Sequence, residues 1–182
     1  GLGAEARLVT RVGDDARGKE LLAWLGEHGL ALDTVQVDRE RPTGTVSVTL
    51  SADGQPTYII HEGVAWDRIA HDGPAREAVR DVDAICFGSL AQRSPVSRAT
   101  IRDLVVASPP RALRIFDVNL RPPFIDREVI ESSMERANVL KLNDDELAML
   151  AEMFGLAGEP REVVAALAGR FGLDVVAVTR GT

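Results

Sequence analysis

The 182-residue chain has few of the residue types that mark several large classes of protein. It contains a single cysteine, Cys86, so no disulfide can form within the chain, and its three histidines are scattered without metal-ligand spacing. No apolar run is long enough to span a bilayer, and no signal-peptide pattern is present. We therefore expect a cytoplasmic protein with no membrane association, and we expect the thiol of Cys86 to be buried in an apolar strand.

Two glycine-rich nucleotide motifs are also missing. The sequence has neither a Gly-x-x-x-x-Gly-Lys-Ser/Thr loop nor a Gly-x-Gly-x-x-Gly fingerprint, which weighs against P-loop and standard dinucleotide-binding proteins. The formal net charge of −7 argues against a nucleic-acid partner. It leaves room for a local cationic pocket that binds a phosphorylated small molecule.

Helical and strand patterns alternate along most of the chain. The predicted helices are residues 14–28, 74–80, 95–107, 127–136, 144–154 and 160–171, and the predicted strands are residues 7–12, 32–37, 83–87, 113–118, 138–142 and 174–178. This alternation predicts an α/β fold with a mainly parallel sheet, right-handed crossovers and helices on both faces. Ser94 is the expected cap of the helix at 95–107. We interpret Asp14, Asp15 and the neighbouring glycines as structural residues of a strand-to-helix turn.

One segment has a different pattern. Residues 45–50 alternate polar and apolar side chains, and a turn separates them from a second short strand at 57–60. This pattern predicts an antiparallel hairpin. Val46, Val48 and Leu50 would share one apolar face, which needs cover from the rest of the protein or from another subunit.

Polar residues gather where the predicted parallel strands end, which is where ligands bind in open α/β sheets. They are Ser89, Asp117, Asn119, Arg121, Asn143, Glu146, Thr179, Arg180 and Gly181. Polar and cationic groups at one sheet edge are what a phosphate-handling site requires.

Asn143 and Glu146 are the most informative of these residues. Asn143 ends an apolar strand and a helix begins at once, so both side chains should face whatever lies at that helix N-terminus, and we expect Glu146 to share the exposed side of Asn143. The terminus could seat a phosphate, and Glu146 could hold a divalent cation directly or through water. The structural alternative is a capping box between Asn143 and Glu146.

Asp117, Asn119 and Arg121 alternate, so they would share one face if the strand stays extended that far. Arg121 could pair with a phosphate or a substrate carboxylate, or could simply be a surface residue of a turn. Thr179 and Gly181 could cradle a phosphate through backbone N–H groups, although an ordinary strand-to-loop turn explains them equally well.

Five motifs occur in order along the chain: Val12-Gly13-Asp14-Asp15-x-x-Gly18, Pro42-Thr43-Gly44-Thr45, Asp117-x-Asn119-x-Arg121, Lys141-x-Asn143-x-x-Glu146 and Val178-Thr179-x-Gly181. This order resembles the ribokinase-like (PfkB-type) carbohydrate kinases. Glu62-Gly63-Val64-Ala65-Trp66-Asp67 and Phe87-Gly88-Ser89-Leu90 are most similar to the bacterial fructokinases. The Asp-x-Asn-x-Arg element is also similar to that of ketodeoxygluconate kinases.

The resemblance implies a kinase that uses ATP and Mg²⁺ to phosphorylate a small-molecule sugar. It implies an α/β body at 1–41 and 65–182, with a β lid at 42–64 that closes over the sugar and pairs two subunits into a homodimer. Asn143 and Glu146 would organise Mg²⁺ and phosphates, Thr179 and Gly181 would line the ATP side, and Arg121 would reach the transferring phosphate or an acidic substrate group.

The sequence departs from the family pattern at both ends. It lacks the sugar-binding Asp and Gly-Gly-x-x-x-Asn elements, and it lacks the Gly-Ala-Gly-Asp element that supplies the anion hole and the catalytic Asp. We therefore expect an internal portion of a sugar kinase that is inactive alone. The alternative is a degenerate kinase-like module that binds or dimerises without catalysis.

Overall fold

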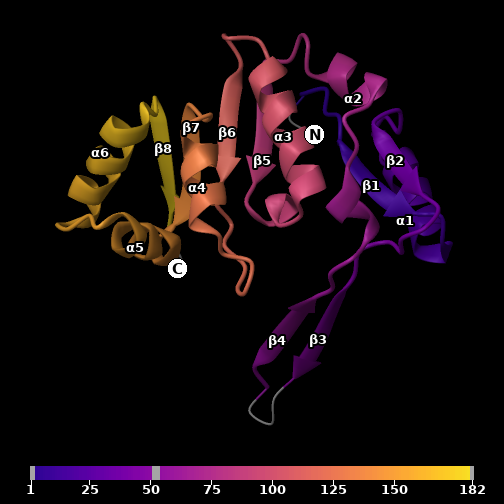
Figure 1. Ribbon diagram of the computed structural model, residues 1–182, viewed down its shortest axis with the longest axis horizontal. Coiled ribbons are helices and arrows are strands. Elements are labelled where there is room, and N and C mark those ends of the chain that lie inside the picture. Colours follow the sequence, from indigo (N-terminus) through magenta and orange to yellow (C-terminus); the bar gives the residue numbers. More distant parts are fainter. Residues whose placement is uncertain (1–2, 51–53, 181–182) are drawn as a thin grey trace. The chain divides into compact units, whose positions relative to one another are not determined.

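The computed structural model describes residues 3–50 and 54–180. The chain divides into two compact units, residues 1–78 (unit 1) and residues 79–182 (unit 2), and Figure 1 labels their helices and strands.

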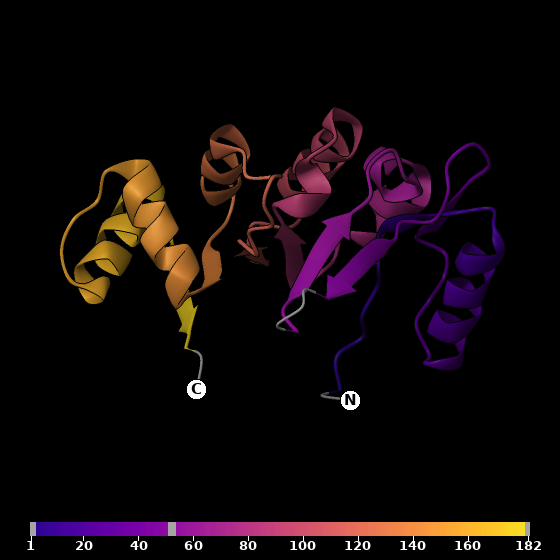
Figure 2. The ribbon, with the colours of Figure 1, turned by 90° about the horizontal axis from the view of Figure 1, so that it is seen from below.

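Unit 2 is built on a parallel sheet of four strands in the order β5-β6-β7-β8. Its elements are β5 (Ala84–Gly88), the 3-10 helix η2 (Leu90–Gln92), α3 (Pro95–Ala107), β6 (Leu113–Asp117), α4 (Arg127–Met134), β7 (Val139–Asn143), α5 (Asp144–Phe154), α6 (Pro160–Phe171) and β8 (Val175–Thr179). Because the strands are parallel, their carboxyl ends meet at one edge, and Figure 2 views the sheet from that end.

One face of this sheet forms the core of unit 2. Phe116 of β6 lies opposite Leu140 of β7 in the register, and both side chains are fully buried. Helices α4, α5 and α6 pack onto this face through residues that include Ile130, Leu150 and Leu167, each 0% exposed. Burying one such side chain contributes about 1.5–3 kcal/mol, so this face holds the strand ends in place.

The opposite face of the same sheet is more open within the described residues. Cys86, Leu113 and Val175 lie on it and are exposed. The prediction of a buried thiol was therefore wrong, because Cys86 alternates with Phe87, and Phe87 takes the side that packs against the core.

Unit 1 combines a short parallel pair with a separate hairpin. Its elements are β1 (Thr10–Gly13), α1 (Ala16–Glu27), β2 (Val35–Asp38), β3 (Val46–Leu50), β4 (Pro56–Ile60), the 3-10 helix η1 (Ala65–Arg68) and α2 (Gly73–Ala78). Strand β1 pairs with β2 in parallel, and Val12, Leu25 and Val35 form a small core between them and α1.

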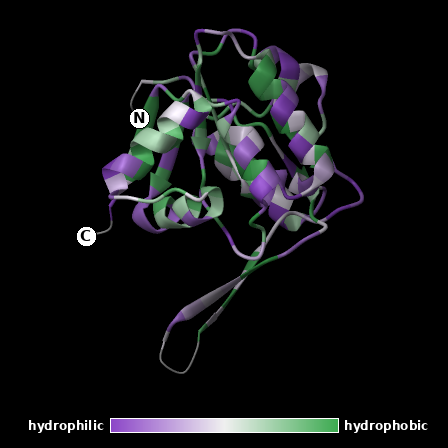
Figure 3. Cartoon of the chain, turned by 60° about the vertical axis from the view of Figure 1, so that its left-hand side comes forward, coloured by the Kyte–Doolittle hydropathy of each residue, from purple (hydrophilic) through white to green (hydrophobic). Residues whose placement is uncertain are grey.

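The hairpin of β3 and β4 is antiparallel, as predicted, and stands apart from the other elements of its unit (Figure 3). Val46 pairs with Ile60, Val48 with Tyr58 and Leu50 with Pro56, so one face is entirely apolar. Val48, Leu50 and Tyr58 are 57%, 67% and 62% exposed. An apolar face this open is typical of a surface that another element or molecule covers.

The base of the hairpin is tied to the start of α1 by Asp15. Its carboxylate accepts hydrogen bonds from the Gly18 N–H, the Thr43 N–H and the Thr43 hydroxyl, each at 2.8 Å, and the Gly13 N–H donates to the Thr43 hydroxyl oxygen at 2.9 Å. A Cβ atom at Gly18 would overlap the Gly13 carbonyl oxygen, so this contact requires glycine. Asp15 and these glycines are thus structural, as predicted from the sequence.

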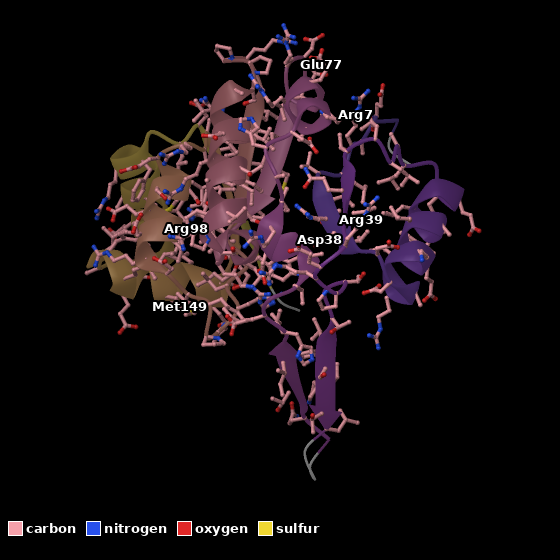
Figure 4. The ribbon with its side chains drawn as sticks, turned by 45° about the vertical axis from the view of Figure 1, so that its right-hand side comes forward. Arg7, Asp38, Arg39, Glu77, Arg98 and Met149 are labelled. Carbon is pink, nitrogen blue, oxygen red and sulfur yellow. The ribbon has the colours of Figure 1, made fainter. Side chains whose placement is uncertain are left out.

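A second carboxylate, Asp38 at the end of β2, orders the chain that leads into the hairpin (Figure 4). It forms an ion pair with Arg11 at 2.9 Å and accepts hydrogen bonds from the N–H groups of Glu40 and Arg41. Burial opposes ionisation of Asp38, but these two N–H groups and the Arg11 guanidinium outweigh it, so the pKa of Asp38 is lowered.

Most predicted boundaries lie close to the observed ones, but the strand predicted at 32–37 begins only at Val35 as β2, and there are two further local differences. The strand predicted at 7–12 is ordered into β1 only from Thr10, and Arg7 makes an isolated bridge to Ala31. Ser94 occupies the N-cap position of α3, but its side chain makes no capping hydrogen bond. Among the described residues, the structure contains no helix that is both long enough and apolar enough to cross a membrane.

The Asp15 contacts predict a specific acid response. Hydrogen bonds from Thr43 and Gly18 lower the pKa of Asp15 from 3.8 to about 2, so its ionised form stabilises the fold above about pH 4 and that contribution is lost as the pH falls toward 2. Urea unfolding should show that Asp15→Asn is less stable than the wild type at pH 6, and that this difference shrinks between pH 4 and pH 2. The control is Asp14→Asn, an exposed carboxylate in a surface ion pair with Lys19, for which a smaller pH-dependent difference is expected.

Candidate active site

The N-terminus of α5 is closed by its own side chains. Asn143 is the N-cap, its side chain accepts the Glu146 N–H at 2.9 Å, and Glu146 accepts the Asn143 N–H at 2.9 Å in return. The predicted helix start is confirmed, and the geometry is the reciprocal capping box that the sequence left as an alternative.

The sequence had suggested that Glu146 shares the exposed side of Asn143. This prediction was wrong. The Glu146 side chain is 5% exposed, whereas Asn143 is exposed. The cause is a contact that the sequence does not show: Oε1 of Glu146 accepts the backbone N–H of Leu120 at 2.9 Å, which draws the carboxylate inward beneath the end of β6.

The segment after β6 is bent rather than extended. Strand β6 ends at Asp117, and Asn119 has a φ of 40°, in the left-handed region that non-glycine residues seldom adopt. The strand therefore does not stay extended as far as Arg121, so Asp117, Asn119 and Arg121 do not share one strand face. Burial still alternates, because Val118 and Leu120 are buried while Asn119 and Arg121 are exposed at the edge of the sheet.

An ion pair lies at the same edge. Lys141 of β7 is the register partner of Asp117, and its Nζ donates to both Asp117 carboxylate oxygens at 3.1 and 3.3 Å. Partial burial and the Asp117 carboxylate raise the pKa of the neighbouring Cys86 thiol, while Lys141 opposes this, so the thiol form is favoured. Lys141 had no predicted role, although its alternation with Asn143 in the sequence places both residues on one face of β7.

Thr179 and Asn143 are brought side by side. They are register partners at the ends of β8 and β7, and the Thr179 hydroxyl donates to the Leu142 carbonyl oxygen at 3.3 Å. Gly181, the other residue assigned to this part of the site, lies outside the described residues. Arg121 folds back, with its guanidinium donating to the Leu120 carbonyl oxygen at 2.8 Å.

The charges at the start of α5 favour a cation. Asp144, Asp145 and Glu146 occupy its first turn, and Arg180, which follows β8, forms an ion pair with Asp144 at 3.9 Å, so a phosphate alone would meet more carboxylates than cations at this helix start. No group of three or more histidine, cysteine or acidic side chains within residues 3–50 and 54–180 could enclose a metal ion. Mg²⁺ commonly binds through one or two carboxylates, with water and substrate phosphates as its remaining ligands, and the donors here fit that mode.

Comparison with known proteins identifies the family of the chain. Residues 1–182 match the family described as pfkB family carbohydrate kinase. The chain belongs to this family. It is 28% identical over 156 residues to fructokinase-2 of Solanum habrochaites, a match that covers 82% of the chain and 48% of that protein. The chain thus spans about half the length of the curated relatives that it matches.

Solved structures share the fold. A sugar kinase of Pyrococcus horikoshii in complex with ATP has a TM-score of 0.76 at 25% identity, over 85% of this chain and 53% of that one. A structure from Escherichia coli described as ribokinase II in complex with ATP and Mg²⁺ has a TM-score of 0.80 at 18% identity, over 99% of this chain and 58% of that one. The predicted ribokinase-like α/β fold with a small antiparallel sheet is confirmed.

The Asp117–Lys141 pair should contribute little to folding. Their side chains are 35% and 38% exposed, and half-exposed ion pairs typically contribute about 0.2–1 kcal/mol. In a double-mutant cycle of Asp117→Asn and Lys141→Met, urea unfolding should give a coupling energy within that range. The Glu131–Arg170 pair, at 2.9 Å and similarly exposed, is the matched control. A coupling energy well above that of the control would show that the Asp117–Lys141 pair stabilises the fold, and it would remove the case that the pair is kept for binding a ligand.

Proposed function

We propose that the protein to which this chain belongs is an ATP-dependent sugar kinase that transfers the γ-phosphate of MgATP to a sugar hydroxyl. The observation that carries the proposal is the juxtaposition of Asn143, Thr179 and the Asp117–Lys141 pair on adjoining rows of one sheet edge, in a chain that matches a carbohydrate kinase family over its whole length. Fructose or a related ketose is the preferred acceptor, because fructokinases recur among the relatives.

The polar edge offers a role for each residue. Asn143 and Thr179 would face the phosphates of ATP, together with Gly181. Glu146 has both oxygens engaged by backbone N–H groups, so it would act on Mg²⁺ through a bound water rather than as a direct ligand. Mg²⁺ would supply charge neutralisation for the transferring phosphoryl group.

Arg121 is the residue in this proposal that bears on substrate choice. Among the described residues, its guanidinium is held only by the carbonyl oxygen of the neighbouring Leu120, and its side chain is exposed, so it can swing toward a ligand. A guanidinium binds a phosphate or a carboxylate in a bidentate manner. A keto-sugar acid such as ketodeoxygluconate is therefore the second candidate acceptor.

The hairpin of unit 1 would serve as the lid, residues 42–64, between the two parts of the body. Its exposed apolar face would cover the sugar and pair with the same face of a second subunit, which gives a homodimer. The same surface supports the alternative in which the chain is a kinase-like dimerisation module without catalysis.

A direct assay separates these functions. The 182 residues contain no Gly-Ala-Gly-Asp element, and loss of a positioned base typically lowers turnover about 10²–10⁴-fold. We expect the full-length protein to phosphorylate fructose or ketodeoxygluconate with MgATP, in a panel that includes ribose, and we expect the 182-residue chain to show no robust turnover. Activity of the short chain would show that it contains its own base. If the full-length protein phosphorylates none of the panel, the dimerisation module becomes the better assignment.

The lid has its own test in solution. A lysine at position 48 would place a charge in the middle of the apolar face, so Val48→Lys should convert a dimer into a monomer in sedimentation velocity at micromolar concentration. Thr49→Lys is the matched control, because Thr49 lies on the opposite face of the same strand and should leave the dimer intact. A wild-type protein that sediments as a monomer under these conditions removes the case for lid pairing.

A further inference from the structure

The Glu146 carboxylate does more than helix capping requires. The same capping box recurs at α6, where Glu162 accepts the N–H of Glu159 at 2.8 Å. Glu162 is exposed, whereas Glu146 is 5% exposed and turns its other oxygen to the N–H of Leu120, 26 residues away. Burying a carboxylate is costly unless hydrogen bonds to its oxygens offset the loss of water. Capping uses only one oxygen of Glu146, so capping alone does not explain its burial.

The group that Glu146 holds lies next to the unusual backbone of Asn119. A left-handed φ at a non-glycine residue persists only where surrounding contacts fix it. The chain before Asn119 is fixed by Val118, whose N–H donates to the Lys141 carbonyl oxygen at 3.0 Å and whose carbonyl oxygen accepts the Ser89 hydroxyl at 2.6 Å.

After Asn119, the Glu146 carboxylate fixes the chain. It accepts a hydrogen bond from the Leu120 N–H, and the Leu120 side chain is buried in the core of unit 2, with 6% of its surface exposed. Without the carboxylate this buried N–H would lose its acceptor, and the bend at Asn119 would lose its second restraint.

We infer that Glu146 is a positioning residue that clamps the backbone of residues 119–121 to the start of α5, and thereby sets where Asn119 and Arg121 stand at the sheet edge. Its effect on turnover rests on the proposed kinase function, but the clamp itself does not. In this role Glu146 connects the segment that follows β6 to the start of α5. The connection does not depend on whether a water molecule bound to its carboxylate also binds Mg²⁺.

Hydrogen exchange at single-amide resolution tests the clamp in the full-length protein without reference to activity. Glu146→Met keeps the length of the side chain and removes both acceptors, so exchange of the Leu120 amide should accelerate about tenfold or more. The Val118 amide, held by Lys141, should stay protected. Glu162→Met is the matched control and should leave Leu120 unchanged, since Glu162 caps only its own helix.

A second variant covers the case in which Glu146→Met does not fold. Glu146→Gln retains one acceptor oxygen for two donors, so the Leu120 or the Asn143 amide must lose protection. If neither amide accelerates in a folded Glu146 variant, the inference is overturned.

Kinetics then test whether the clamp positions Arg121. In a cycle of Glu146→Gln with Arg121→Met, the rise in KM for the acceptor caused by Arg121→Met should be several-fold smaller in the Glu146→Gln background, because the guanidinium is already displaced. Additive effects of Glu146 and Arg121, with a changed Mg²⁺ requirement alone, would assign Glu146 to the metal and overturn the positioning role. If the protein phosphorylates no sugar, the kinase proposal fails and the exchange data still decide whether the clamp exists.

Discussion

Parallel pairing of β5 to β8 is the constraint on which the candidate site depends. Parallel strands finish at the same edge of a sheet, so residues that are far apart in sequence but end a strand become neighbours. The register does the rest: it sets Asp117 beside Lys141 and Asn143 beside Thr179 on adjoining rows. The buried face with Phe116 and Leu140 stabilises this register, because a slip of one residue would turn those side chains to the exposed face.

The parts of the fold that the sequence predicts best are those with local causes. Helix α5 spans the predicted residues, because the Asn143 cap and the Gly155 stop are both encoded within one or two turns. The hairpin was equally predictable from its period-two alternation. The capping box at Asn143 and Glu146 needs only a spacing of three residues, so the sequence shows it directly.

What the sequence does not show is contact across the fold. The Leu120 N–H meets Glu146 across 26 residues, and Lys141 meets Asp117 across 24, so both depend on the order of the strands rather than on any local pattern. The burial of Glu146 followed from the first of these contacts and reversed the expected exposure. The prediction for Cys86 was wrong in the opposite sense, since the thiol was expected to be buried and is exposed. The reason is that an apolar run does not reveal which of its two faces the helices will cover.

The charges around this edge explain why a phosphate and a cation would enter together. The first turn of α5 carries Asp144, Asp145 and Glu146, which cancel the attraction that a helix N-terminus otherwise offers to an anion. Lys141 is already paired with Asp117, so it adds little net positive charge. Two guanidinium groups at the same edge offset part of this negative charge, because Arg121 is exposed there and Arg180 forms an ion pair with Asp144 at 3.9 Å. In the proposed kinase, Mg²⁺ bound to the phosphate would bring further positive charge to the site. In the proposed kinase, the acidic first turn of α5 would therefore favour the magnesium complex of a nucleotide over the free nucleotide.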